Sequence, residues 1–255
     1  MNALETRGLT KRFGGLVAVD SLDLVLPEGG LVGLIGPNGA GKTTVFNLVS
    51  GLYAPDAGSI LVRDHDLAGH PPHEVARHGI ARTFQNIRLF GSLTALDNVR
   101  VGAHMVCGGS YLSAILGGRQ SRELDRRSRE QAMQVLRDIG IERYANELAS
   151  SLPYGVQRKL EIARALASSP SVLLLDEPAC GMNPQETAEL MELVARLLQE
   201  WKLSILLIEH DMRFVMGICQ TIYVLDYGKT IACGPPEAIR NDPAVIEAYL
   251  GDAVH

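Results

Sequence analysis

The sequence has few cysteines, and they are scattered. Cys107, Cys180, Cys219 and Cys233 lie far apart and form no C-x-x-C pair. Paired cysteines at short spacing are what a zinc site or a disulfide framework normally requires. Both are therefore poorly supported, and a reducing compartment is the simplest expectation.

Long apolar runs are also missing. The opening residues, MNALETRGLTKRFGG, contain no apolar core of a signal peptide. No stretch approaches the roughly 18 continuous apolar residues that a membrane span requires. We therefore expect a chain that does not cross a membrane by itself, although partners could hold it against one.

The chain carries no excess of positive charge. Its formal net charge of -5 argues weakly against a protein that mainly neutralises nucleic-acid phosphate, so no nucleic-acid partner is expected. What the chain does have is apolar content, at 46% of 255 residues. That is ample for a packed core, either in one large α/β domain or in a main domain with a smaller lobe.

Short runs of branched apolar residues recur along the chain. They lie at 31–35, 60–62, 172–175, 205–208 and 222–225. Runs without polar alternation indicate strands that are buried on both faces, as in a mostly parallel sheet covered by helices. Residues 186–200 carry a helical pattern after Asn183-Pro184, which is a plausible helix start.

The residue pattern changes between residues 96 and 150, where the short apolar runs typical of buried strands are missing. The spacing of Ala132, Val135, Leu136 and Ile139 predicts a helix that ends at Gly140. A second amphipathic pattern covers 155–166. We expect a helical lobe here.

The strongest signal is LVGLIGPNGAGKTTVFNLVSG, which satisfies G-x-x-x-x-G-K-[ST] between a predicted strand at 31–35 and a predicted helix at 42–49. Glycines let successive N–H groups and the helix N-terminus point at phosphate oxygens. Lys42 is expected to reach the β- and γ-phosphates, and the Thr43 hydroxyl to bind Mg²⁺. The predicted nucleotide-binding residues here are Gly36, Pro37, Asn38, Gly39, Ala40, Gly41, Lys42, Thr43 and Thr44.

A second signal, SVLLLDEPA, places two carboxylates after a predicted strand, at the sheet edge where ligands of such sheets bind. Asp176 is expected to hold Mg²⁺ through water. Glu177 is expected to orient or deprotonate the attacking water in ATP hydrolysis. Alone, such a pair would more often only cap a loop; beside a phosphate-binding loop, the catalytic interpretation is favoured.

Together these motifs resemble the ATP-binding subunits of ABC transporters. The landmarks GPNGAGKTT, RTFQN, LPYGVQRKLEIARAL, LLLDEP and LLIEHD occur in the family's order and cover nearly the whole chain. The resemblance implies a P-loop NTPase (RecA-like) α/β fold with a mostly parallel sheet, an N-terminal antiparallel β subdomain and an inserted helical lobe. It divides the chain into an ATP-binding core at 1–95 and 160–255 and a helical signature lobe at 96–159.

The same resemblance assigns three further roles, with ATP and Mg²⁺ as cofactors. Gln85 is the loop glutamine that touches Mg²⁺ and water and senses the membrane subunit. His210 is the switch histidine at the γ-phosphate, and Phe13 is the aromatic that stacks on adenine. Taken singly, each of these residues has a more ordinary explanation. A phenylalanine is more often a core residue, and a glutamine is more often a surface residue. A histidine after a strand is more often only a hydrogen-bond partner at the strand end.

The signature segment departs from the family's usual L-S-G-G-Q, because Leu152, Pro153, Tyr154, Gly155 and Val156 stand in its place. By resemblance this tip covers ATP held by a partner, so Pro153, Tyr154 and Gly155 are predicted to bind nucleotide. Pro153 offers neither a hydroxyl nor an N–H, but it suits a first helical turn. The helix N-terminus can still face an anion, and we expect ATP sandwiching to persist with a weaker or differently shaped contact.

A second departure is Asn183, where the family often has an aspartate; an asparagine can hydrogen-bond across an interface but is uncharged. One phosphate cradle and one tip per chain imply a second ATPase subunit, either a copy or a paralogue. Transmembrane permease subunits and, indirectly, a solute-binding protein follow from the same resemblance, as does a peripheral location at the cytoplasmic face of the inner membrane.

The details RTFQNIRLFGSLTALDNV, LDEPACGMNP and DPAVIEAYLG are most similar to the branched-chain amino acid importer branch. Urea, amide and aromatic-acid importers share much of this pattern and stay open. A non-transport ABC ATPase is disfavoured because a second cassette, coiled coils and zinc insertions are missing. A P-loop kinase would leave LPYG and His210 without a purpose.

Two charged or histidine-rich stretches have ordinary explanations. The arginines at 119, 122, 126, 127 and 129 alternate with acids and are expected on the solvated side of a helix. His65, His70, His73 and His78 fit no zinc spacing, and Pro71-Pro72 is expected to break any helix that they would share, so we expect loop histidines.

Overall fold

The computed structural model describes residues 1–107 and 119–251, and these form two compact units. The first unit comprises 1–82 and 171–255, and the second comprises 83–170. The second unit therefore contains all of the predicted lobe 96–159 and extends beyond it at both ends.

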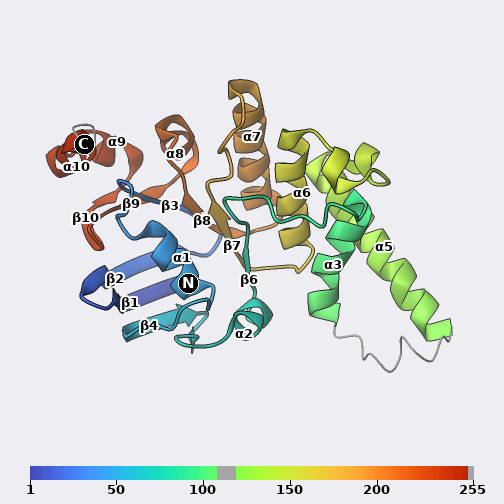
Figure 1. Cartoon of the computed structure of the whole chain (residues 1–255), viewed down its shortest axis with the longest axis horizontal. Helices are drawn as coiled ribbons and strands as arrows, with labels where there is room; N and C mark the ends of the chain where they lie inside the picture. Colours follow the sequence, from blue (N-terminus) through green and yellow to red (C-terminus); the bar gives the residue numbers. More distant parts are fainter. Residues whose placement is uncertain (108–118, 252–255) are drawn as a thin grey trace. The chain divides into compact units, whose positions relative to one another are not determined.

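The first unit is built on two sheets (Figure 1). One has four antiparallel strands in the order β2-β1-β4-β5. The other has six strands in the order β10-β9-β3-β8-β7-β6, all parallel neighbours except the edge strand β10. The first sheet comprises β1 Asn2–Phe13, β2 Leu16–Pro27, β4 Ala57–Val62 and β5 His65–Asp66. The second comprises β3 Leu31–Ile35, β6 Ile80–Arg82, β7 Val172–Asp176, β8 Ser204–Ile208, β9 Thr221–Asp226 and β10 Lys229–Gly234.

One prediction about strands is wrong. The run at 60–62 lies in β4, which pairs with β1 in the antiparallel sheet and not in the parallel one. Ile60 and Val62 are buried, whereas the residues between and before them are half-buried or exposed. Three residues are too short a window to distinguish one-sided from two-sided burial. The other four predicted runs lie in β3, β7, β8 and β9 of the parallel sheet.

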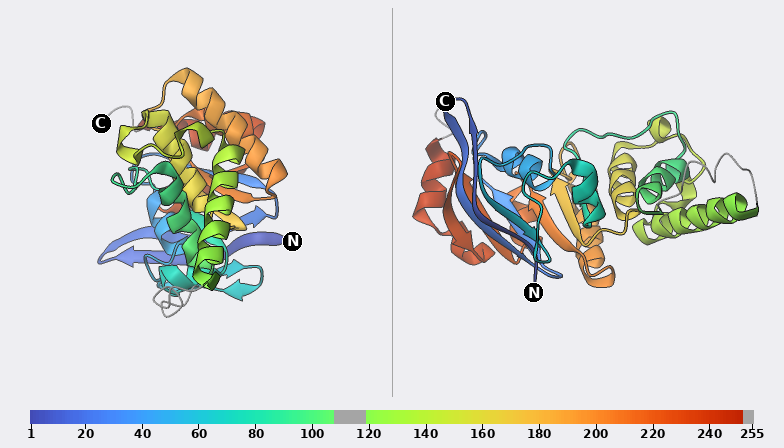
Figure 2. Two further views of the ribbon diagram at one scale, coloured as in Figure 1. Left: turned by 90° about the vertical axis from the view of Figure 1, so that its right-hand side faces the viewer. Right: turned by 90° about the horizontal axis from the view of Figure 1, so that it is seen from below.

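Helices surround these sheets in the first unit (Figures 1 and 2). Their bounds are α1 Lys42–Val49, α2 Pro72–Arg77, α7 Pro184–Glu200, α8 Met212–Ile218, α9 Pro236–Arg240 and α10 Pro243–Gly251. One hydrophobic core joins buried side chains of both sheets to Val45, Phe46, Leu48 and Val49 of α1. The long strands β1 and β2 run beside the six-stranded sheet in the right-hand view of Figure 2.

The second unit is helical, as predicted. It contains α3 Ala95–Cys107, α5 Arg119–Ile139, α6 Tyr154–Leu166 and the short 3₁₀ turns η1 Glu142–Tyr144 and η2 Ala149–Ser151. Helices α3, α5 and α6 pack on one another. The four predicted core positions of α5 are buried and the helix is followed by Gly140 at φ 77°. This confirms the predicted helix end.

The two ordinary stretches are now placed. Arg126, Arg127 and Arg129 are exposed on α5, with Arg126 paired to Glu130 at 3.6 Å, which confirms the solvated face for these three; the side chains of Arg119 and Arg122 lie outside the described residues. The histidines are not all in loops: His65 lies in β5 and His73 in α2, because Pro72 begins that helix. Within 1–107 and 119–251, no helix is long and apolar enough to span a bilayer.

Candidate functional site

The turn between β3 and α1 forms a cradle of backbone. Lys42, the first residue of α1, is buried and donates from Nζ to the carbonyls of Gly36 and Pro37, at 2.7 Å each. The lysine therefore lies back across the loop that it follows. Thr43 is exposed at the start of the helix.

Two glycines make this turn possible. Gly36 adopts φ 148°, and a Cβ there would lie 2.0 Å from the carbonyl oxygen of Leu225. Gly41 adopts φ 106°, and its Cβ would lie 2.3 Å from the carbonyl oxygen of Ala18. Both the backbone conformation and the close neighbours exclude a side chain at these positions.

The sheet register brings the second motif level with this cradle. Ile208 of β8 pairs with Leu34 on one side and with Asp176 on the other. Adjacent strands are about 4.8 Å apart, so Asp176 lies roughly 10 Å from Leu34 along the sheet edge. The loops that carry the phosphate-binding motif, the acidic pair and His210 therefore leave the sheet at neighbouring positions.

The donor types at this edge suit a magnesium nucleotide. The N-cap of α1 is Gly41, which has no side chain to cap the helix, so the partial positive charge of this N-terminus can act on a phosphate. The Thr43 hydroxyl and the Asp176 carboxylate are hard oxygen donors of the kind that Mg²⁺ prefers. The residues present therefore fit the predicted cofactors.

Asp176 has a buried partner that the sequence did not reveal. Its Oδ2 accepts from Arg82 Nη2 at 2.7 Å, and the two side chains are only 7% and 8% exposed. Arg82 Nη1 also donates to Asn47 Oδ1 at 2.7 Å and to Ser50 Oγ at 3.1 Å. The guanidinium thus links the end of β7 to the last turn of α1, across a separation of 94 residues between Arg82 and Asp176.

Glu177 and His210 are in contact. His210 Nε2 lies 2.6 Å from Glu177 Oε1, with side-chain exposures of 44% and 13%. Glu177 also adopts φ 47°, a left-handed conformation that costs a non-glycine residue about 1–3 kcal/mol and occurs often at functional sites. The structure therefore brings the predicted catalytic carboxylate and switch histidine together, in a pair accessible to solvent.

A second buried acid, Glu209, steadies this pair. Its carboxylate accepts the backbone N–H groups of Ala179 at 2.7 Å and His210 at 3.0 Å, and of Asp211 at 3.4 Å. Burial raises the pKa of Glu209, and these hydrogen bonds oppose that effect. Glu209 therefore links the loop after Glu177 to the loop that carries His210. The only sign of this role in the sequence is the glutamate of the LLIEHD motif.

Phe13 is not a core residue. Its side chain is 43% exposed and packs edge-on against Tyr53, with ring centroids 5.4 Å apart. Phe13 pairs with Leu16 at the end of the β1–β2 hairpin, two residues before Ala18, whose carbonyl abuts Gly41. An exposed aromatic on the hairpin whose Ala18 abuts the cradle can stack on a planar base. Its contact with adenine stays a prediction.

Gln85 and the signature tip belong to the second unit. Gln85 is exposed, and its carbonyl accepts from Arg158 Nη2 at 2.5 Å. Pro153 is the N-cap of α6 and so precedes the helix instead of entering its first turn; Tyr154 is the first helical residue and Gly155 is buried. The contacts of these residues with Mg²⁺ or nucleotide stay predictions.

Asn183 has a local role. Its side chain accepts from the N–H groups of Gln185 and Glu186 at 3.0 Å, and Glu186 accepts from the Asn183 N–H at 3.0 Å. This is a capping box at the start of α7. Asparagine serves that purpose as well as aspartate does.

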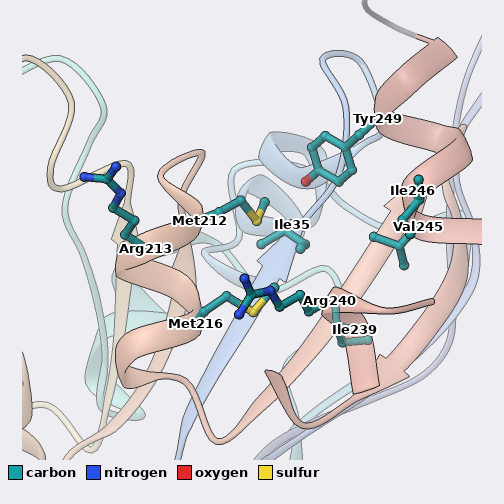
Figure 3. A pocket seen from close by; sticks show the side chains of 9 residues that line it. All are labelled: Ile35, Met212, Arg213, Met216, Ile239, Arg240, Val245, Ile246 and Tyr249. Carbon is teal, nitrogen blue, oxygen red and sulfur yellow. The ribbon is translucent and has the colours of Figure 1, made fainter. Parts of the chain in front are cut away.

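A cavity that the sequence did not predict adjoins the cradle in the first unit. Its volume is about 620 Å³, and its lining comes from Ile35 and from α8, α9 and α10 (Figure 3). Burial raises the pKa of Tyr249 to about 12, opposed by a hydrogen bond from the Gly36 N–H. The last described helix therefore contacts the first glycine of the phosphate-binding motif.

Comparison with known proteins extends over the whole chain. Residues 19–180 match the family model described as ABC transporter, and residues 229–255 match that of branched-chain amino acid ATP-binding cassette transporter. The chain is 49% identical to the high-affinity branched-chain amino acid transport ATP-binding protein LivG of Escherichia coli (strain K12), over 98% of each chain. It is 46% identical to BraF, the corresponding protein of Pseudomonas aeruginosa, over the same shares. Among solved structures, an ATP-binding cassette of an ABC transporter in its ADP conformation superposes with a TM-score of 0.86 at 29% identity, covering 98% of this chain and 99% of that one.

Proposed function

The chain is an ATP-hydrolysing member of the ABC transporter family, and we propose that it powers the import of branched-chain or other hydrophobic amino acids. The observation that carries the choice of solute is the match at 229–255, because the phosphate-binding core is shared by ABC proteins with many cargoes. Similarity to LivG and BraF over 98% of the chain supports the same choice.

The geometry of the first unit supports a division of labour in hydrolysis. The backbone of the Gly36–Gly41 turn and Lys42 bind and orient the phosphates. Glu177 holds the attacking water and takes its proton, and His210, at 2.6 Å, keeps that carboxylate in place and can reach the γ-phosphate. Bound Mg²⁺, held by Thr43 and Asp176, would neutralise charge that develops on the phosphate oxygens.

A second ATPase subunit completes the site in this proposal. The tip at Pro153–Gly155 covers the nucleotide of the partner, whose own tip covers the nucleotide on Lys42. The N-cap of α6 is Pro153, which makes no side-chain cap hydrogen bond, and the partial positive charge of this helix N-terminus suits a phosphate. The partner is a copy of this chain or a paralogue, and the pair sits peripherally on permease subunits at the cytoplasmic face of the inner membrane.

Reconstitution tests the proposal. The chain is co-expressed with the permease and ATPase genes that neighbour it, and the purified complex is placed in liposomes with ATP and the matching solute-binding protein. We expect ATP-dependent uptake of leucine, isoleucine or valine, and no uptake with the Glu177→Gln chain. ATP-dependent uptake of urea, an amide or an aromatic acid, without leucine uptake, would overturn the choice of solute. Failure to recover any permease would overturn the transport role.

A further inference from the structure

Helix α6 holds the loop that carries Gln85 through a buried charge. This Gln85 loop comprises residues 83–90, and both it and α6 lie in the second unit. Arg158 of α6 donates from Nη1 to the carbonyl of Phe84 at 3.0 Å and from Nη2 to that of Gln85 at 2.5 Å. Its side chain is only 4% exposed. A buried guanidinium needs an acceptor for each of its donors, so these carbonyls are held firmly.

Glu161, one turn further along α6, holds the same loop by its amides. Its Oε1 accepts from the N–H groups of Phe84 at 3.4 Å and Arg88 at 3.3 Å, and its side chain is 2% exposed. Glu161 Oε2 also lies 3.6 Å from Arg158 Nη1. Burial raises the pKa of Glu161, and the Arg88 N–H, the Arg158 charge and the Phe84 N–H oppose that effect. The acid and the base therefore bind the donors and the acceptors of one loop.

Tyr154 supplies the remaining acceptor. Arg158 donates to the Tyr154 hydroxyl from Nε at 3.2 Å and from Nη2 at 2.9 Å, and the guanidinium lies 5.4 Å from the ring centroid. Tyr154 stands where the signature segment of the family usually has its first glycine. A glycine has no side-chain oxygen, so this contact depends on the substitution that made the segment atypical.

We propose that Tyr154, Arg158 and Glu161 fasten the Gln85 loop to the first turns of α6, so that the loop and the helix tip move as one piece. Tyr154 belongs to the tip and accepts from Arg158, and Arg158 is the positioning residue that also contacts the loop. This inference rests on the proposed function for its consequence: a displacement of the Gln85 loop by the permease reaches the tip over the partner's nucleotide without loss. Here the tyrosine replaces the flexibility of a glycine by a fixed linkage.

Amide hydrogen exchange on the full chain tests the fastening. We expect Arg158→Met to speed exchange at Phe84 and Arg88 by about tenfold, and Tyr154→Phe, which removes one oxygen, to speed it by about threefold. In Arg158→Lys the exchange rate at Phe84 and Arg88 should lie between those of the other two variants, because the lysine keeps the charge but lacks the several N–H donors of the guanidinium. Amides at 162–166 of α6 should stay protected in all three. Wild-type exchange at Phe84 and Arg88 in both Arg158→Met and Tyr154→Phe would overturn the proposal.

Arg143→Met is the matched control. Arg143 is an exposed arginine of the second unit whose guanidinium lies 4.7 Å from the Tyr144 ring centroid, far from the Gln85 loop in sequence. Its exchange pattern at Phe84 and Arg88 should equal that of the wild type. Should Arg158→Met not fold, Tyr154→Phe and Arg158→Lys carry the test.

The consequence is measured in the assembled transporter. The ratio of solute-stimulated to basal ATP hydrolysis should fall roughly fivefold in Arg158→Met and stay at the wild-type value in Arg143→Met. A wild-type ratio despite faster exchange at Phe84 would overturn the coupling role. The exchange measurement needs neither permease nor solute, so a wrong choice of solute would not change its outcome.

Discussion

The two units fix their functional loops by different means. In the first, the loops that begin at Gly36, Glu177 and Glu209 each leave a parallel strand, and the register of β3, β8 and β7 sets their positions. In the second, the Gln85 loop is held by side chains of α6 and, at Phe90, by Asn98 of α3. Loops at a sheet edge are positioned by many backbone hydrogen bonds between strands, whereas the Gln85 loop is positioned by a few side chains. Substitutions should therefore act on chemistry in the first unit and on loop order in the second.

The largest effect tests the chemistry of the first unit. Glu177→Gln keeps the shape of the side chain but removes the base, so ATP turnover should fall by about 10²–10⁴-fold. ATP affinity should change by less than about threefold, because the backbone cradle is untouched. Steady-state hydrolysis and nucleotide binding measure the two quantities. The exposed Glu192→Gln on α7 is the control; brisk hydrolysis by Glu177→Gln would remove Glu177 from its role.

A second substitution asks whether the sheet edge also depends on one side chain. Arg82→Met leaves the buried Asp176 carboxylate unpaired, which should lower the free energy of unfolding by about 3–5 kcal/mol. Arg82→Lys should cost less because the charge remains. Denaturant unfolding followed by the fluorescence of Trp201, the single tryptophan, reports on the first unit.

Arg77→Met provides the comparison for Arg82, since Arg77 is exposed at the end of α2. Its unfolding midpoint should match the wild type within error. An equally unchanged midpoint in Arg82→Met would mean that strand pairing alone holds Asp176 in place. The first unit would then depend on backbone hydrogen bonds and not on the ion pair, in contrast to the second unit.

The sheet-borne part of the site was accessible from the sequence. A buried strand followed by a glycine-rich turn, and another followed by two acids, place Lys42 and Asp176 at one edge because parallel strands end together. The pairing of Glu177 with His210 follows from the same rule. These signals are local in the chain, and the topology that joins them is common to doubly wound sheets.

The side-chain clamps were not accessible in this way. Arg82 and Asp176 are 94 residues apart, and Arg158 and Gln85 are 73 apart. Helical periodicity correctly placed Leu160 and Ala163 in the core of α6, but it reports only apolar faces. A buried charge breaks that pattern and is taken for a solvated position, so its partner has to be seen in the structure.

The buried acids offer a test by pH. Burial raises the pKa of Glu209 above its ordinary value of 4.5, so the folded state holds that proton more tightly than the unfolded one. The contribution of Glu209 to stability is therefore greatest below pH 4.5 and declines as the pH rises through the folded pKa. Against Glu209→Gln, the difference in unfolding free energy, wild type minus variant, should fall as the pH rises.

The exposed Glu237→Gln on α9 should leave the pH dependence of wild-type stability as it is. A difference between wild type and Glu209→Gln that grows with pH would contradict the assigned shift. Glu161→Gln carries the same test into the second unit, where burial again raises the pKa but the Arg158 charge opposes it. In the second unit, Glu161→Gln should also speed amide exchange in the Gln85 loop, because Glu161 binds backbone N–H groups of that loop. Glu209→Gln should have no such effect on the Gln85 loop.

The smallest effect asks whether the sheet edge is sufficient for the cradle. Tyr249→Phe removes one hydrogen bond to the Gly36 N–H, a loss of about 0.5–1.5 kcal/mol, so ATP affinity should fall by about two- to tenfold. Tyr227→Phe, at a fully accessible tyrosine of the same unit, should change nothing. If Tyr249→Phe binds ATP as the wild type does, β3 and its neighbours hold the turn unaided. If affinity falls, the first unit also relies on a single side chain, because α10 then steadies the loop that the sheet only begins.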